Sequence, residues 1–384
     1  MADSSTDQGS DRGIKDGVRS YSGGLGLREL PGLWRRDWKR AYAILTREHA
    51  DEEEPKGRFR RFWRRTKNLF FGLSYKLSPS RRLLFAICLI LTLLGLDTDT
   101  VQVGEESIEI WKHPVLLLVA VIGLVFLLIL ELADRVLVRD ELEVARQLQR
   151  DLLPRKAPEV GGYDFAFSYR SANTVGGDYY DFLSLPDGRL GLVSADASGH
   201  GMASALLMAI ANTTLTLAVD IDAEPTAVAR MMNTALVGTG GPRAFLTLFY
   251  GLLVPDTGQM AYVCAGHPFP MIRRAGGKIE KLGTGSFPIG LRPQREFMTA
   301  ATELRRGDLL LLYTDGIPEA VGADGEAFGF DRLEKSLEKG GAPREVHDRI
   351  LADLDEFEGD EAPRDDRSLV VIARLGGNLS REAH

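Results

Sequence analysis

The sequence predicts an α+β domain built mostly of antiparallel strands, preceded by two membrane-spanning helices and a helical linker. From about residue 165 onward, short apolar strands alternate with glycine-rich turns, and helices are grouped between them. This arrangement is typical of layered α+β domains. Upstream lie two long apolar runs, residues 83–96 and 115–130, and a helical pattern without Gly or Pro over residues 131–153.

Composition limits the classes of protein that the chain can represent. A length of 384 residues allows one sizeable catalytic domain and an additional segment. The two cysteines, Cys88 and Cys264, provide neither a disulfide framework nor a CxxC metal site, so a reducing cytoplasm suits the soluble part. The net charge is −7 although residues 55–82 contain ten Lys or Arg and no acid. The remaining chain is therefore strongly acidic, which argues against nucleic acid as its ligand.

The N-terminal part divides into a tail and a basic segment. Residues 1–54 are predicted to be a partly disordered cytoplasmic tail with one short amphipathic helix within residues 27–49. Residues 55–82 form a basic juxtamembrane segment, in which residues 58–73 place aromatic and aliphatic side chains on one side and six Arg or Lys around the other. Such a helix suits the headgroup region of an anionic membrane. A nucleic-acid-binding helix is the alternative, and the apolar runs that follow disfavour it.

The two apolar runs predict a transmembrane hairpin over residues 83–133. Each run is slightly shorter than the roughly 20 residues that span a bilayer, so buried core helices are the alternative. The flanks separate by charge, because Arg81 and Arg82 precede the first run whereas residues 97–112 form an acidic loop. Basic residues stay inside, which predicts a cell-membrane protein with its N-terminus and catalytic domain in the cytoplasm.

Residues 134–154 are predicted to be a helical linker. Apolar residues recur with the mean spacing of 3.5 that is typical of coiled coils, and this spacing favours a homodimer through the linker. These residues are Val138, Leu142, Ala145, Leu148 and Leu152. A rigid stalk without a regulatory role is the alternative.

The catalytic domain is expected over residues 155–376, followed by a C-terminal tail, residues 377–384. Helices are predicted at residues 202–217, 225–236, 333–337 and 344–354, and strands at 245–254, 259–265 and 271–274. Residues 256–258 have the composition of a hairpin turn between two of these strands.

Several carboxylates occur beside predicted core strands. An apolar run delivers Asp196 to a strand end before a turn of small residues, and a second run, residues 309–313, leads to Asp315. Asp178 lies in a GGD sequence, and the pair Asp365 and Asp366 precedes a third apolar run. Taken alone, Asp196 could be a helix N-cap. Together, carboxylates next to core strands indicate a cation, and a ligand set of oxygens selects Mg²⁺ or Mn²⁺ over zinc.

Six sequence blocks in order resemble the PPM (protein phosphatase 2C-like) serine/threonine phosphatases. The blocks are GGDYYD (176–181), DASGHG (196–201), AGHPFP (265–270), FPIGL (287–291), GDLLLLYTDGIPE (307–319) and DDRSLVVI (365–372). Within this family, the blocks resemble more closely the bacterial branch typified by stage II sporulation protein E and the stress-response phosphatases that regulate sigma-factor pathways. The resemblance covers roughly residues 145–375 and implies a PPM-type sandwich of two antiparallel sheets flanked by α-helices.

The resemblance also implies a site that holds two ions, Mn²⁺ or Mg²⁺. Asp196 would bridge the ions, Asp315 and Asp365 would complete one of them, and Asp178 would lie near the second. The backbone carbonyl of Ala197 is a further implied ligand. Asp366 is the alternative to Asp365, which fits the family pattern better.

Two histidines and one cysteine accompany these blocks. His200 has a side chain suited to protonating a serine or threonine leaving oxygen, with a turn-stabilising hydrogen bond as the alternative. His267 is expected to brace a loop near the site. A nucleophilic pair of Cys264 and His267 is disfavoured because a thiolate requires an electropositive setting.

The leading interpretation is a membrane-tethered metal-dependent phosphatase for phosphoserine or phosphothreonine. By resemblance, its substrate would be a phosphorylated STAS-type anti-sigma-factor antagonist of a bacterial partner-switching pathway. The alternative is an inactive membrane scaffold that binds phosphoprotein through the same fold, although such a binder would not need the acidic residues. A phospho-aspartate mechanism lacks its DxD motif at Asp315, and a nucleotide cyclase would leave the other blocks unexplained.

Overall fold

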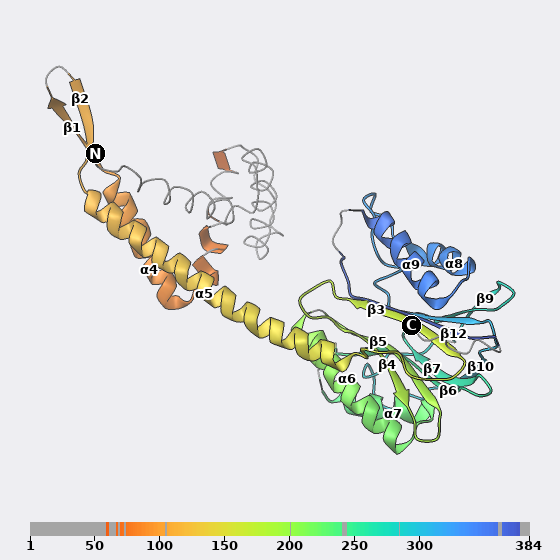
Figure 1. Ribbon diagram of the computed structural model, residues 1–384. Coiled ribbons are helices and arrows are strands. Elements are labelled where there is room, and N and C mark those ends of the chain that lie inside the picture. Colours follow the sequence, from red (N-terminus) through yellow and green to blue (C-terminus); the bar gives the residue numbers. More distant parts are fainter. Residues whose placement is uncertain are drawn as a thin grey trace, which may run out of the picture. The chain divides into compact units, whose positions relative to one another are not determined.

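The computed structural model describes residues 59–60, 67, 70–72, 74–103, 106–199, 201–239, 244–283, 285–359 and 363–376. The amphipathic helix expected within residues 27–49, most of the basic segment and the tail 377–384 lie outside the described residues. The chain divides into two compact units, residues 1–135 and 136–384, and each is described by itself. Figure 1 labels most of the elements of both.

The first unit contains two apolar helices with a β-hairpin between them in sequence. Helix α4 is Pro79–Gly95, and helix α5, Pro114–Leu152, begins in this unit and continues into the second. Strands β1 (Thr98–Val103) and β2 (Glu106–Trp111) pair antiparallel. The prediction that residues 97–112 form a loop is therefore wrong, because most of them lie in these two paired strands. The segment alternates its acidic residues with Thr, Val and Ile, which favour strands and outweigh the charge.

Helices α4 and α5 pack against each other in opposite directions. Arg81 Nη1 donates a hydrogen bond of 2.5 Å to Asp134 Oδ2. Further along α4, a Cβ on Gly123 would lie 2.4 Å from Cys88 Sγ, so the helices approach closely where a glycine allows it. Among the described helices, α5 and α6 (Met202–Ile221) are long and apolar enough to cross a membrane. Helix α4 has 17 residues and would be about 26 Å long.

The second unit is a sandwich of two five-stranded antiparallel sheets, as expected. The first sheet has the order β10-β7-β6-β5-β4, with β4 Asp178–Ser184, β5 Leu190–Ala197, β6 Leu246–Val254, β7 Gln259–Ala265 and β10 Ala300–Glu303. The second has the order β3-β12-β11-β8-β9, with β3 Tyr163–Arg170, β8 Met271–Arg273, β9 Ile279–Lys281, β11 Leu309–Tyr313 and β12 Arg367–Arg374.

A pair of helices covers the outer face of each sheet. Helices α6 and α7 (Pro225–Val237) pack on the first sheet, and α8 (Gly329–Glu338) and α9 (Pro343–Glu358) lie on the side of the second (Figure 1). Proline begins both α7 and α9, where its missing N–H costs no helical hydrogen bond. The four helices confirm the predicted ones and extend beyond them, most clearly α8.

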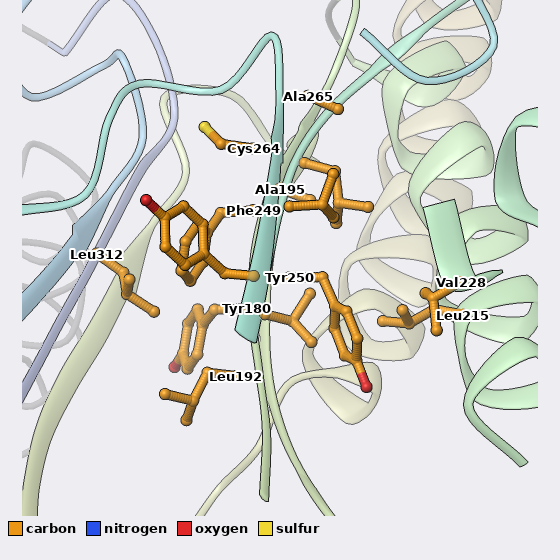
Figure 2. Packing of buried hydrophobic residues seen from close by; sticks show 14 of the residues in the cluster. Tyr180, Leu192, Ala195, Leu215, Val228, Phe249, Tyr250, Cys264, Ala265 and Leu312 are labelled. Atoms are coloured by element: carbon orange, nitrogen blue, oxygen red, sulfur yellow. The ribbon is translucent and has the colours of Figure 1, made fainter. Parts of the chain in front are cut away.

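Residue alternation along the strands divides the buried side chains into two cores. On β11, Leu310 and Leu312 belong to the core between the sheets, whereas their neighbours Leu309 and Leu311 pack with α8 and α9. On β6, Phe249 points to the side of Leu312, and Tyr250 points to the side of the α6 and α7 helices (Figure 2). Central strands are therefore buried on both faces, which explains why they are continuous apolar runs in the sequence.

Candidate active site

The ends of four strands bring the predicted carboxylates together. Asp178 is the first residue of β4 and lies opposite Asp196, near the end of β5, in the antiparallel register. In the other sheet, Asp315 follows β11 by two residues, and Asp365 precedes β12 by two. Strands β11 and β12 are paired neighbours, so both sheets contribute acidic residues to the same end of the sandwich.

Thr314 connects the two sheets at this end. Its hydroxyl Oγ1 donates a 2.6 Å hydrogen bond to Asp178 Oδ2 and accepts one of 2.9 Å from the backbone N–H of Ser368. Thr314 is completely buried. The hydroxyl therefore fixes the Asp178 carboxylate relative to the paired strands β11 and β12.

Two glycines of the motifs are required by close backbone contacts. A Cβ on Gly177 would lie 2.7 Å from the carbonyl oxygen of Ala197, and one on Gly316 would lie 1.9 Å from the carbonyl oxygen of Asp366. Both distances are far below a normal contact. The GGD and TDG sequences thus allow the strand ends to approach closely enough to gather their aspartates.

The gathered carboxylates raise one another's pKa. Burial, followed by the charges of Asp315 and Asp365, raises the pKa of Asp196 to about 7. Burial and the charge of Asp365 raise the pKa of Asp315 to about 6. Burial and the charge of Asp196 raise the pKa of Asp178 well above its ordinary value. Without a cation, this part of the protein therefore resists full ionisation.

Asp365 and Asp366 occupy different environments. The two carboxylate oxygens of Asp366 accept hydrogen bonds from the backbone N–H groups of Ala172, at 2.8 Å, and Gly177, at 2.6 Å. Asp365 is exposed, and its Oδ1 accepts the N–H of Asp366. Backbone N–H groups therefore bond both carboxylate oxygens of Asp366, whereas Oδ2 of Asp365 stays available to bind a cation.

The donors at this end of the sandwich suit a hard divalent cation. All the gathered side chains are carboxylates or hydroxyls, and such oxygen ligands favour Mg²⁺ or Mn²⁺. Among the described residues, no three His, Cys, Asp or Glu side chains form a ready-made metal cage. The carboxylates lie close enough to shift each other's pKa but are not closed around one point.

His267 and Cys264 have structural contacts. The ring nitrogens of His267 lie 2.9 Å from the hydroxyls of Ser194 and Thr247, and burial lowers its pKa to about 3. The thiol of Cys264 donates to the carbonyl oxygen of His267, and burial raises its pKa to about 12. These contacts agree with a bracing role for His267 and give no support to a thiolate nucleophile.

His200 lies outside the described residues, so its role as a proton donor stays a prediction. Two residues with clear contacts at the site were not predicted. Thr314 was visible only as part of the TDG motif. Gln149 donates a hydrogen bond to the carbonyl oxygen of Gly176. The sequence feature that could have indicated it is a polar residue on the same helical stripe as the apolar residues Leu142, Ala145 and Leu152.

Comparisons with known proteins agree with this geometry. Residues 186–375 match the family model described as stage II sporulation protein E (SpoIIE). Protein IcfG of Synechocystis sp. is 26% identical over 264 residues, which cover 62% of this chain and 42% of IcfG. Phosphoserine phosphatase RsbU of Bacillus subtilis is 25% identical over 244 residues, which cover 62% of this chain and 71% of RsbU. The chain thus matches less than half the length of IcfG.

A solved structure supports the fold. The SiaA-PP2C domain of Pseudomonas aeruginosa has a TM-score of 0.56 with this chain at 22% sequence identity. The likeness covers 64% of this chain and 99% of that domain. The sandwich described above is therefore a PP2C-type fold.

Proposed function

Through residues 186–375 the chain belongs to the SpoIIE-type family of PP2C phosphatases, and on this premise we propose that it is a membrane-tethered, metal-dependent protein phosphatase. Its substrates would be phosphoserine or phosphothreonine residues. The observation that carries the proposal is the convergence of Asp178, Asp196 and Asp315 from two sheets, with pKa values raised by burial and by neighbouring carboxylates.

The protein's own residues would hold the ions and the substrate in place. Asp178, Asp196, Asp315 and Asp365 would hold the ions, with Asp196 as the ligand shared by both, because its carboxylate interacts with the other three. Divalent ions bound there would lower the pKa of a water molecule and neutralise phosphoryl oxygens. The carbonyl oxygen of Ala197 is a further proposed ligand. The oxygen-only donors favour Mn²⁺ or Mg²⁺.

A phosphorylated protein is the proposed substrate class. RsbU, a relative, is named a phosphoserine phosphatase. We propose a STAS-type anti-sigma-factor antagonist as the substrate, by likeness to the sigma-factor-regulating branch of the family. His200 remains a proposed proton donor to the leaving serine or threonine oxygen.

Exposed apolar side chains support the membrane tether. Within the first unit, Leu83 and Leu93 on α4 are 64% and 65% exposed, and Val115 and Leu118 on α5 are 67% and 61% exposed. Helices that expose such residues around much of their surface suit lipid rather than water. We also propose that the basic segment contacts anionic lipid and that the linker part of α5 forms a homodimer. Flotation with anionic and neutral liposomes tests the lipid contact, and cross-linking in the membrane tests the dimer.

Turnover of a phosphoserine peptide by the full chain in detergent micelles tests the catalytic proposal. With Mn²⁺ we expect hydrolysis that EDTA removes and that Asp196→Asn and Asp315→Asn reduce by more than about 100-fold, since ligand loss exceeds the usual effect of outer-shell changes. Asp187→Asn, on an exposed turn, is the matched control and should keep full activity. Peptide binding without hydrolysis would instead identify the scaffold alternative.

A further inference from the structure

The side chain of Gln149 forms two hydrogen bonds to a single buried residue. Gln149 lies in the last turn of α5 and is only 4% exposed. Its Nε2 donates to the carbonyl oxygen of Gly176 at 2.6 Å, and the N–H of Gly176 donates to its Oε1 at 3.0 Å. The same Nε2 lies 3.3 Å from the hydroxyl oxygen of Tyr169. The side-chain amide therefore pairs with the backbone of Gly176 much as a neighbouring strand would.

The residue held in this way is surrounded by the acidic residues of the site. Gly177, the next residue, donates its N–H to Asp366 Oδ2, and its carbonyl oxygen accepts the N–H of Ala197 at 3.1 Å. Asp178 then follows directly. A Cβ on Gly176 would lie 2.2 Å from Asp366 Oδ2, so the turn fits tightly. A displacement of Gly176 would consequently move Asp178 and release a contact of Asp366.

The chemistry of the contact requires glutamine. A carboxamide carries both a donor and an acceptor, and the Gly176 backbone needs one of each. A glutamate would keep the acceptor and place a charge against the Gly176 carbonyl oxygen. A methionine would fill nearly the same volume without either hydrogen bond, leaving two buried backbone groups unsatisfied.

We propose that Gln149 is a positioning residue of the metal site, which holds the Gly176–Gly177 turn so that Asp178 and the carbonyl of Ala197 face the bound ions. This inference rests on the proposed metal-dependent function. It assigns to the end of α5 a part in the affinity of the site for its cations, which Gln149 exerts through the backbone of Gly176. Outer-shell contacts of this kind typically change metal affinity by 10–100-fold.

Gln149→Met in the full chain in detergent micelles tests the proposal, and Gln147→Met is its matched control. Gln147 lies one half-turn earlier on the same helix, is exposed, and bonds only Asp151 among the described contacts. We expect the Mn²⁺ dissociation constant, measured from the free-ion signal in electron paramagnetic resonance, to rise about 10–100-fold for Gln149→Met. The control Gln147→Met should keep the wild-type Mn²⁺ dissociation constant and the wild-type kcat for a phosphoserine peptide.

Amide hydrogen exchange provides a second readout that does not depend on the ions. In ion-free protein, Gln149→Met should accelerate exchange in residues 171–178, whereas Gln147→Met should leave it unchanged. An unchanged Mn²⁺ affinity in Gln149→Met, or an equal loss in both variants, would overturn the proposal. If Gln149→Met fails to fold, Gln149→Glu replaces it, with the same expected direction.

The test separates this inference from the function on which it rests. Wild-type protein that neither binds Mn²⁺ nor hydrolyses the peptide would refute the proposed function. In that case the exchange measurement still decides whether Gln149 holds the turn, because those hydrogen bonds exist without a cation. Unchanged exchange in Gln149→Met would then overturn the positioning role as well.

Discussion

The hydroxyl of Thr314 lies 2.6 Å from Asp178 Oδ2 and ties the end of β11 in one sheet to the start of β4 in the other. A carboxylate that accepts this bond has a defined orientation before any cation arrives. The contact also crosses the interface between the sheets, so the same hydrogen bond contributes to the packing of the sandwich and to the geometry of the site.

Replacement of Thr314 should therefore affect both stability and ion binding. Thr314→Val keeps the shape but leaves the Ser368 N–H without its acceptor, which should cost about 1–3 kcal/mol in the free energy of unfolding. The Mn²⁺ dissociation constant should rise about 10–100-fold. Urea titration and Mn²⁺ titration measure the two effects. Thr216→Val, an exposed helix position, is the control, and a Thr314→Val protein with native affinity would contradict the assigned role.

Neutralising Asp196 should stabilise the metal-free protein while it abolishes turnover. Burial and neighbouring charges disfavour the ionised form of Asp196, so Asp196→Asn removes an unfavourable charge. We expect the melting temperature in EDTA to rise by about 2–8 °C. Asp187→Asn should act in the opposite direction, because hydrogen bonds from Arg189 lower the pKa of Asp187. A lower melting temperature for Asp196→Asn would show that the ionised form of Asp196 does not destabilise the folded protein.

The metal-free protein should lose stability as the pH rises from about 4 to about 7. The folded pKa values of Asp196, about 7, and Asp315, about 6, exceed the value of about 3.9 in an unfolded chain. The folded state consequently holds more protons in this range, and stability falls with increasing pH. Urea unfolding in EDTA at several pH values measures the trend. The Asp196→Asn, Asp315→Asn double variant should show a flatter profile, and identical profiles would contradict the assigned shifts.

Bound ions should reverse this dependence of stability on pH. Cations require ionised carboxylates, so protons compete with them and Mn²⁺ affinity should fall as the pH is lowered from 7.5 to 5.5. Isothermal titration calorimetry in buffers of different ionisation enthalpy would detect the released protons. Binding without proton release near pH 6.5 would show that the ions do not contact Asp196.

Turnover should not need the thiol of Cys264. Burial raises its pKa to about 12, and the thiol is engaged by the carbonyl oxygen of His267. In a Cys88→Ala background, Cys264→Ala should keep activity within about threefold, since no thiolate forms near neutral pH. Iodoacetamide should leave the Cys88→Ala protein active. Rapid loss of activity on alkylation would restore the nucleophile hypothesis.

Local pattern was sufficient to predict the strands that carry the aspartates. The apolar runs before Asp196 and Asp315 are buried on both faces, and such runs are recognisable without knowledge of their partners. The same local reasoning failed for residues 97–112, where acidic residues concealed the alternation of β1 and β2. It also could not predict which helix residues would extend α6 to Ile221.

The hydrogen bonds that support the site could not be predicted from the sequence, for a different reason. Thr314 is separated from Asp178 by 136 residues, and Gln149 from Gly176 by 27, so each pair meets only through the fold. Sequence could place Asp365 and Asp366 together but could not show that backbone N–H groups already satisfy Asp366. Hydrogen-bond partners of this kind depend on strand register rather than on residue type.

The position of β12 has a consequence for biosynthesis. It is the last of the described strands in the chain, yet it lies between β3 and β11, and β3 pairs with no other strand in its sheet. Until residues 367–374 have been translated, β3 has no partner strand, and Asp365 and Asp366 are not yet anchored to the sheet by β12. Completion of the sandwich must therefore wait for almost the whole domain to be translated, which exposes the nascent chain to aggregation and to chaperones.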